Sequence, residues 1–256
     1  DGADYFALML TPSAEQTAGP KDVVVVFDTS ASQTGEFRNQ AMAALHSALA
    51  NLRPEDRVKL LAADLRAVAM TDGFVAANGP EMEEGLAKLL RRAPMGSSDL
   101  PAALSAAVEA FGAGQKARSL VYIGEGASRA NLLAPEDMTR LADQLRTARV
   151  PVVSYAVGPR IDANLLGALA AQTGGVVLGV GENLSSDAIG QQLASAVAEA
   201  VIWPTSANWP ESFAEVIPEK PLPLRADRQN LILGTLKSSD PVEVTMTSQG
   251  PSGAVQ

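Results

Sequence analysis

The chain has 256 residues, a formal net charge of −9 at pH 7 and a pI of about 4.7. This acidic balance argues against nucleic acid or an anionic membrane surface as a partner, because both select for basic patches. Cysteine is absent and there is one histidine, which excludes thiolate metal sites, cysteine catalysis and histidine-rich metal sites.

The first elements lead to a buried strand. Residues 5–10 predict a short strand, and a loop with two prolines separates it from a second strand at 22–28. The run from Val23 to Phe27 holds five consecutive apolar residues, four of them β-branched. Such a run is typical of a strand buried on both faces of a parallel sheet.

From here strands and helices alternate. After the strand at 22–28, further strands are expected at 58–63, 67–70, 119–123, 152–157 and 176–178. Helices are expected at 34–52, 82–90, 100–111, 135–148, 162–174 and from Ile189 to Val201. This order predicts an α/β fold: a doubly wound, mostly parallel six-stranded sheet with helices on both faces. No apolar run reaches the ~18 residues of a membrane-spanning helix, so no direct membrane insertion is expected.

The composition changes at Trp203-Pro204, after which proline is dense. Residues 231–233 and 242–246 predict β-strands, which residues 5–10 could complete into a partial β-sandwich. The predicted organisation is a flanking strand and loop at 1–19, an α/β domain at 20–202 and a Pro-rich, β-rich segment at 203–256. Because the chain starts at Asp1 without an initiator methionine or a signal peptide, we interpret it as part of a larger parent protein.

Oxygen-bearing side chains follow three of the predicted strands or loops. Asp28, Ser30 and Ser32 come directly after the strand at 22–28, Ser98 precedes the helix at 100–111, and Glu125 follows the strand at 119–123. In a doubly wound sheet these loops converge at the carboxyl edge, where ligands bind. Hydroxyls, carboxylates and water are the ligands of small hard cations, so the pattern favours a divalent-cation site.

Each of these residues also has an ordinary structural explanation. Ser30 and Ser32 could turn the chain and cap the first helix, and either Ser98 or Asp99 could cap the next one. Glu125 could be a loop acid. We interpret His46 as structural, since it lies beside the apolar stripe of its helix, and Asp64 as a solvated turn acid.

Four motifs in order resemble the von Willebrand factor A domain over about residues 20–202. Residues 28–32, Asp-Thr-Ser-Ala-Ser, match the family's D-x-S-x-S. Residues 96–100 stand where the family has a glycine, a threonine and often an acid, and residues 124–126, Gly-Glu-Gly, stand where it has T-D-G. Residues 169–175 resemble its late helix ending in a double glycine.

The resemblance implies a metal-ion-dependent adhesion site (MIDAS) holding Mg²⁺, or Mn²⁺ or Ca²⁺. Ser30 and Ser32 would bind the ion directly, Asp28 and Glu125 largely through water, and Ser98 in the ligand-bound state. A carboxylate of a protein partner typically completes the shell. Ser98 in place of threonine keeps the hydroxyl, whereas Glu125 in place of aspartate moves the carboxylate by about 1 Å or more.

The flanks resemble a subgroup of this family. Residues 4–12 and 20–23 are similar to the lead-in of inter-alpha-trypsin inhibitor heavy chains and their bacterial relatives. In that subgroup a strand precedes the domain and β-structure follows it. The subgroup is usually exported, which implies an extracytoplasmic or secreted location.

The leading hypothesis is a non-catalytic binding module that captures an acidic group of a protein partner. One alternative is a structural scaffold whose metal site is degenerate, with Glu125 as the sign of it. A second is a Mg²⁺-dependent phosphate-transferring enzyme that uses Asp28 as nucleophile. Such enzymes carry a second acid two residues on, where this chain has Ser30, and no glycine-rich loop follows the strand to hold a dinucleotide.

Overall fold

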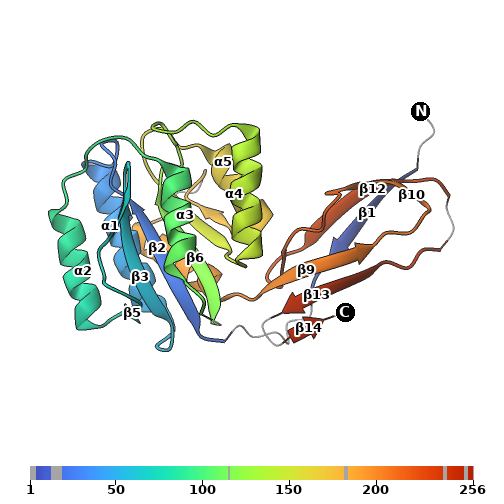
Figure 1. The fold of residues 1–256 in the computed structure, drawn as a ribbon, viewed down its shortest axis with the longest axis horizontal. Helices are drawn as coiled ribbons and strands as arrows, with labels where there is room; N and C mark the ends of the chain where they lie inside the picture. Colours follow the sequence, from blue (N-terminus) through green and yellow to red (C-terminus); the bar gives the residue numbers. More distant parts are fainter. Residues whose placement is uncertain are drawn as a thin grey trace. The chain divides into compact units, whose positions relative to one another are not determined.

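The computed structural model describes residues 4–12, 19–114, 116–181, 184–238, 241–250 and 253–255. They fall into two compact units: Pro20–Ala198, called here the α/β unit, and Asp1–Gly19 with Glu199–Gln256, called the β unit. Within the described ranges all the helices belong to the α/β unit, and the β unit consists of strands and loops (Figure 1).

The α/β unit is built on a sheet with β2 (Lys21–Asp28) at its centre, in the order β4-β3-β2-β6-β7-β8. The other strands on this path are β3 (Arg57–Ala63), β4 (Ala67–Ala69), β6 (Ala117–Gly124), β7 (Val152–Ala156) and β8 (Val177–Leu178). All neighbours pair in parallel except β4, which is antiparallel to β3. The predicted fold class is confirmed. The strand number is seven rather than six, because the short strand β5 (Val75–Ala76), which was not predicted, also pairs with β3.

Within the described residues, six helices cover the two faces of this sheet (Figure 1). Val23, Val25 and Phe27 of β2 pack with one set of helices, and Val24 and Val26 pack with the other. The first set is α1 (Glu36–Asn51), α2 (Pro80–Arg91) and α6 (Ser186–Ala198); the second is α3 (Leu100–Ala110), α4 (Pro135–Thr147) and α5 (Ala163–Thr173). Because successive side chains of a strand point to opposite faces, the continuous apolar run of β2 fills two cores at once.

The strand order places the switch point of the sheet beside β2. From β2 the chain moves outward to β3, whereas β6 returns to the opposite side of β2 and the sheet grows from there. Asp28 pairs in register with Ala63, and Phe27 with Ile123. The loops that follow β2 and β6 therefore leave the same edge of the sheet side by side, which is the usual ligand-binding position in such folds.

The β unit contains two antiparallel sheets. One has the order β1-β12-β10, from β1 (Asp4–Leu10), β12 (Asn230–Leu236) and β10 (Phe213–Ile217). The other has the order β11-β9-β13-β14, from β11 (Leu224–Arg225), β9 (Val201–Asn208), β13 (Thr245–Gly250) and β14 (Gly253–Val255). Since β1 pairs with β12 along its whole length, the N-terminal strand is part of the C-terminal β-structure.

Two predicted boundaries in this region are wrong. Val201 does not lie on the last helix, because α6 ends at Ala198 and Val201 opens β9, where it pairs with Arg225. The strand expected at 242–246 begins only at Thr245, which is the first residue to find a partner on β9, at Asn208. In both places the apolar pattern extends beyond the true boundary of the element. The boundary is set instead by the residue at which strand pairing begins.

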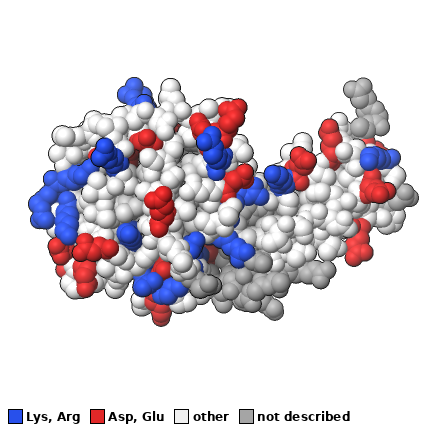
Figure 2. Space-filling model, in the orientation of Figure 1, with Lys and Arg blue, Asp and Glu red and all other residues white. Residues whose placement is uncertain are grey.

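Acidic and basic side chains are interspersed on the visible face of the α/β unit (Figure 2). In the described part of the chain, no helix is both long enough and apolar enough to cross a membrane.

Candidate functional site

The loop after β2 is shaped by Asp28. The backbone N–H of Ser30 donates to Asp28 Oδ1 at 2.8 Å, a local bond that turns the chain away from the sheet. Ala31 N–H then donates to the carbonyl of Gly96 at 3.0 Å, and Met95 N–H donates to the carbonyl of Thr29 at 3.0 Å. The loops that carry two of the predicted motifs are thereby fixed to each other by backbone hydrogen bonds.

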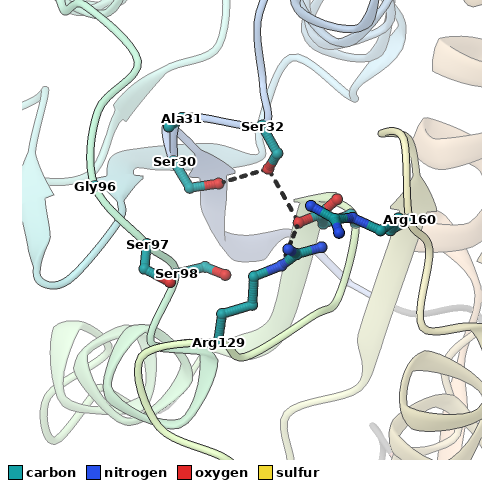
Figure 3. A pocket seen from close by; sticks show the side chains of 9 residues that line it. Ser30, Ala31, Ser32, Gly96, Ser97, Ser98, Arg129 and Arg160 are labelled. Carbon is teal, nitrogen blue, oxygen red and sulfur yellow. Dashed lines mark hydrogen bonds and ion pairs between the residues drawn. The ribbon is translucent and has the colours of Figure 1, made fainter.

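Three of the predicted site residues form a chain of polar contacts (Figure 3). The hydroxyl oxygens of Ser30 and Ser32 lie 3.0 Å apart. The Ser32 hydroxyl donates to Oε1 of Glu125 at 3.0 Å. Side chains from the ends of β2 and β6, more than ninety positions apart in the sequence, thus meet at one point.

The capping explanations for the three serines do not hold. Gly35 occupies the N-cap of α1 and no side chain caps that helix, so neither Ser30 nor Ser32 has this role. Asp99 caps α3, since its carboxylate accepts from Ala102 N–H at 3.0 Å. Ser98 is buried, and its hydroxyl donates to the carbonyl of Ala127, which leaves the oxygen lone pairs available.

Asp28 lies beneath these hydroxyls and is 2% exposed. Its Oδ2 accepts from the hydroxyl of Tyr122 at 3.3 Å, and that hydroxyl in turn accepts from Gly126 N–H at 3.1 Å. Burial raises the pKa of Asp28, opposed by its hydrogen bonds from Ser30, while the nearby Glu125 raises it further. Burial also raises the pKa of Tyr122 well above its ordinary value, so the phenol stays protonated and donates to the carboxylate.

Two glycines allow this close packing. A Cβ at Gly124 would lie 2.5 Å from Asp28 Cβ and 2.6 Å from the Tyr122 hydroxyl. A Cβ at Gly158, whose φ is +143°, would lie 2.8 Å from both Glu125 Cβ and Gln33 Nε2. A larger residue at Gly124 would displace Asp28 or Tyr122, and one at Gly158 would displace Glu125 or Gln33.

Glu125 combines burial with an incomplete set of partners. Its side chain is 1% exposed, and Oε1 accepts from Ser32 and lies 3.5 Å from Nε of Arg129. Oε2 is buried and receives no hydrogen bond from the described residues. A buried carboxylate oxygen without a donor is costly, and such atoms are rare in folded proteins. The site therefore holds an acceptor that a cation or a donating ligand would satisfy.

The three serines and Glu125 lie around a pocket of about 290 Å³. Its lining residues are Ser30, Ala31, Ser32, Gly96, Ser97, Ser98, Glu125, Arg129 and Arg160. Figure 3 shows the serine side chains on one side of this pocket and the two arginines reaching in from another.

The donor set fits a hard divalent cation. It offers serine hydroxyls, the open Oε2 of Glu125 and, beneath them, the Asp28 carboxylate, and all of these are oxygen ligands of the kind that Mg²⁺, Mn²⁺ and Ca²⁺ take. No group of three or more His, Asp or Glu side chains that could hold a metal lies within the described ranges. An ion here would therefore depend on hydroxyls and water as well as on two acids.

Three contributing residues left no sequence signal that marked them. Tyr122 belongs to an apolar strand pattern, and Gln33 lies outside the D-x-S-x-S motif, yet its Nε2 donates to the Val157 carbonyl at 3.0 Å and links the β2 loop to the end of β7. Arg129 stands four residues after Glu125, a spacing that carries no meaning outside a helix.

The interpretation of Asp64 as a solvated acid is wrong. Its side chain is 16% exposed and pairs with Arg92 at 2.6 Å, and Arg92 Nε also donates to Thr29 Oγ1 at 3.2 Å. Asp64 thus supports the loop that carries Ser30. His46 is exposed and its Nδ1 lies 2.7 Å from the carbonyl of Met42 on its own helix, which agrees with the structural interpretation.

Comparison with known proteins decides the family. A family model described as the von Willebrand factor type A domain matches residues 21–177, from the first residue of β2 into β8. The chain belongs to the von Willebrand factor type A domain family. The narrower resemblance to inter-alpha-trypsin inhibitor heavy chains stays a prediction.

Solved structures of von Willebrand factor type A proteins share the fold. A von Willebrand factor type A protein from Catenulispora acidiphila aligns with a TM-score of 0.68 at 14% identity, over 99% of this chain and 71% of its own. The ArnB paralog VWA2 from Sulfolobus acidocaldarius aligns with a TM-score of 0.61 at 14% identity, over 98% of this chain and 68% of its own. Both alignments extend over nearly the whole chain, so each includes residues of the β unit.

A third structure adds a metal. Proximal thread matrix protein 1 from the mussel byssus, described with a zinc-occupied MIDAS motif, aligns with a TM-score of 0.52 at 16% identity. The alignment covers 73% of this chain and 50% of the mussel chain. A metal is thus recorded at the MIDAS of a protein with this fold.

Proposed function

We propose that this von Willebrand factor type A domain is a non-catalytic binding module that holds one divalent cation and captures an acidic group of a protein partner. The observation that carries the proposal is the buried, unpaired Oε2 of Glu125 beside the linked hydroxyls of Ser30 and Ser32. A buried glutamate at the switch point of the sheet, with one oxygen on a serine hydroxyl and the other open, is an arrangement that a hard cation would complete.

The residues would divide the work as the family resemblance implies. Ser30 and Ser32 would ligate the ion, Asp28 and Glu125 would supply negative charge directly or through water, and Ser98 would join when the ligand is bound. The cation, Mg²⁺ or else Mn²⁺ or Ca²⁺, would supply the positive charge that attracts a carboxylate. The hydrogen bond from Tyr122 fixes the Asp28 carboxylate, so the charge beneath the hydroxyls is preorganised.

Calorimetric titration of Mg²⁺ and Mn²⁺ into metal-stripped protein tests this proposal. We expect one site of millimolar or better affinity, weakened by about 10- to 100-fold in Asp28→Asn, because that change removes the charge and keeps the shape. Asp143→Asn is the matched control, since Asp143 is an exposed acid on α4 outside the pocket. Equal affinity in the wild type and Asp28→Asn would overturn the site assignment.

A structural scaffold without a working metal site is the second candidate. The ion pair between Arg129 and Glu125 favours it, because a guanidinium already supplies positive charge next to the acid. Absence of heat from both metals, with binding of an acidic partner retained, would establish this alternative instead. Mg²⁺-dependent release of phosphate from p-nitrophenyl phosphate would overturn the non-catalytic assignment.

The location that accompanies this proposal is extracytoplasmic or secreted, since the subgroup that the flanks resemble is usually exported. Fractionation of cells expressing the full-length parent protein would test it. Recovery with the cytoplasmic fraction would contradict it.

A further inference from the structure

Two arginines line the pocket, in addition to the acidic and hydroxyl groups assigned to the metal. Arg129 follows β6 in the loop that carries Glu125, and Arg160 follows β7. Figure 3 shows the side chains of both extending into the pocket from separate loops. Cationic side chains beside a cation site need a reason, because they repel the ion that the acids attract.

The contact of Arg129 with Glu125 is loose. Its Nε lies 3.5 Å from Oε1, whereas charge-assisted N–H···O bonds are usually ~2.7–2.9 Å, and Oε2 is left without a partner. The Arg129 side chain is also 38% exposed. A guanidinium held by one long contact at a partly exposed position is displaced at little cost.

Arg160 is exposed, and no hydrogen bond or ion pair joins it to another residue in the described part of the chain. Its guanidinium is therefore available to an anion entering the pocket. Arginine suits this role because its planar donors match the two oxygens of a carboxylate.

The charges around the pocket define what a ligand must bring. Asp28 and Glu125 balance Arg129 and Arg160, so the four side chains carry no net formal charge. A divalent cation would leave two positive charges in excess. A single carboxylate cancels one of them, and a ligand with two carboxylates cancels both.

We propose that Arg129 leaves Glu125 when the cation binds and, with Arg160, holds a second acidic group of the ligand, so that the site selects ligands with two nearby carboxylates. This inference rests on the metal site put forward under the proposed function. Arg129 has opposite effects in its two states: it competes with the metal before loading, and it strengthens ligand binding afterwards.

The first measurement is calorimetric titration with Mg²⁺ alone. Arg129→Gln removes the competing charge, so we expect Mg²⁺ to bind about three- to fivefold more tightly than in the wild type. Arg91→Gln, an equal charge change at an exposed position of α2 outside the pocket, is the control and should leave the affinity unchanged. Equal or weaker Mg²⁺ binding in Arg129→Gln would overturn the competition.

The second measurement compares glutarate with its monoamide, glutaramate, in the presence of saturating Mg²⁺. The two molecules have the same length and differ by one carboxylate. Wild-type protein should prefer glutarate by about tenfold or more, because the second carboxylate gains charge-assisted hydrogen bonds from arginine. Arg129→Gln and Arg160→Gln should each lose most of this preference, and Arg129→Lys should regain part of it.

The two measurements separate this inference from the proposed function. If the wild type binds Mg²⁺ but shows no preference for glutarate, the metal site stands and the two-carboxylate ligand is refuted. If the wild type binds no Mg²⁺ but Arg129→Gln does, the native metal site is refuted, whereas Arg129 is established as the competing cation. Loss of the glutarate preference in Arg91→Gln would refute the role of the two pocket arginines.

Discussion

The two edges of the sheet around β2 both carry buried acids, which are fully hydrogen-bonded at one edge and incompletely at the other. At the amino end, the buried carboxylate of Asp56 accepts from the backbone N–H of Lys21 at 2.8 Å and from Arg53, and both oxygens of Asp22 accept from Arg57 at 2.9 and 2.8 Å. At the carboxyl end, Glu125 is equally buried but keeps one oxygen open.

The difference separates acids whose hydrogen bonds stabilise the fold from an acid with an oxygen that is open to a ligand. Buried charges that are fully hydrogen-bonded fix the strand in register, and removing one partner is costly because the other is left unpaired. A buried acid with an open oxygen lacks the stabilisation of a full set of hydrogen bonds, but that oxygen can still bind a cation or a donor. Four variants test this contrast, in order of the size of the expected effect.

The largest effect is expected from Asp56→Ala at the amino end. The change removes the buried carboxylate that accepts from the Lys21 N–H and the Arg53 guanidinium, so the free energy of unfolding should fall by about 3 kcal/mol. Urea denaturation followed by circular dichroism measures this. Mg²⁺ affinity of the folded protein should not change, and a large loss of affinity would show that the two ends are not independent.

Tyr122→Phe should have an intermediate effect, because the Tyr122 hydroxyl both accepts from the Gly126 N–H and donates to Asp28. Its loss leaves Gly126 N–H unpaired and removes the donor to Asp28, which should lower the free energy of unfolding by about 1–2 kcal/mol. Mg²⁺ affinity should fall by about tenfold. Unchanged affinity in a destabilised variant would mean that Tyr122 supports the fold alone.

Asp28→Asn should reveal what it costs the folded, metal-free protein to keep Asp28 ionised and buried. At pH values well below the ordinary pKa of aspartate, about 3.9, the carboxyl is protonated in both folded and unfolded states. As the pH rises from there to the raised pKa of folded Asp28, the unfolded chain loses its proton first, so the wild type loses stability that the variant keeps. The stability of Asp28→Asn relative to the wild type should therefore increase with pH and then level off.

Thermal denaturation of both proteins across pH 3–8 without metal measures this difference. A difference that stays constant, or that changes in favour of the wild type as pH rises, would contradict the burial of an ionised acid at the site. Asp143→Asn again serves as the exposed control.

The smallest effect is expected from Glu125→Asp, which restores the family's usual acid. The shorter side chain keeps the charge and lengthens the contact with Arg129, so Mg²⁺ affinity should stay the same or rise by up to about threefold. Calorimetry resolves a change of this size. A clear loss of affinity would mean that the loop after β6 has adapted to the longer glutamate.

The sequence alone specified much of the α/β unit because its signals are local and strong. The run from Val23 to Phe27 predicted a strand buried on both faces, and the helix expected at 162–174 is α5, with Asp162 as its N-cap and Gly174 as its C-cap. The D-x-S-x-S residues and Glu125 were expected at one edge, since the carboxyl ends of parallel strands lie at the same edge of a sheet. The short strand β5 and the pairing limits of β9 and β13 were not predictable, because they depend on a neighbour rather than on a pattern.

What the sequence determined about this protein is its fold and the oxygen-rich edge at which a ligand would bind. What only the tertiary structure decided is which polar atoms are satisfied there. The Tyr122 hydroxyl on Asp28 and the Ser32 hydroxyl on Glu125 join residues from separate elements, and the loose contact of Arg129 with Glu125 is set by the path of one loop. Hydrogen bonds act over about 3 Å, so they are set by how loops pack and not by spacing along the chain.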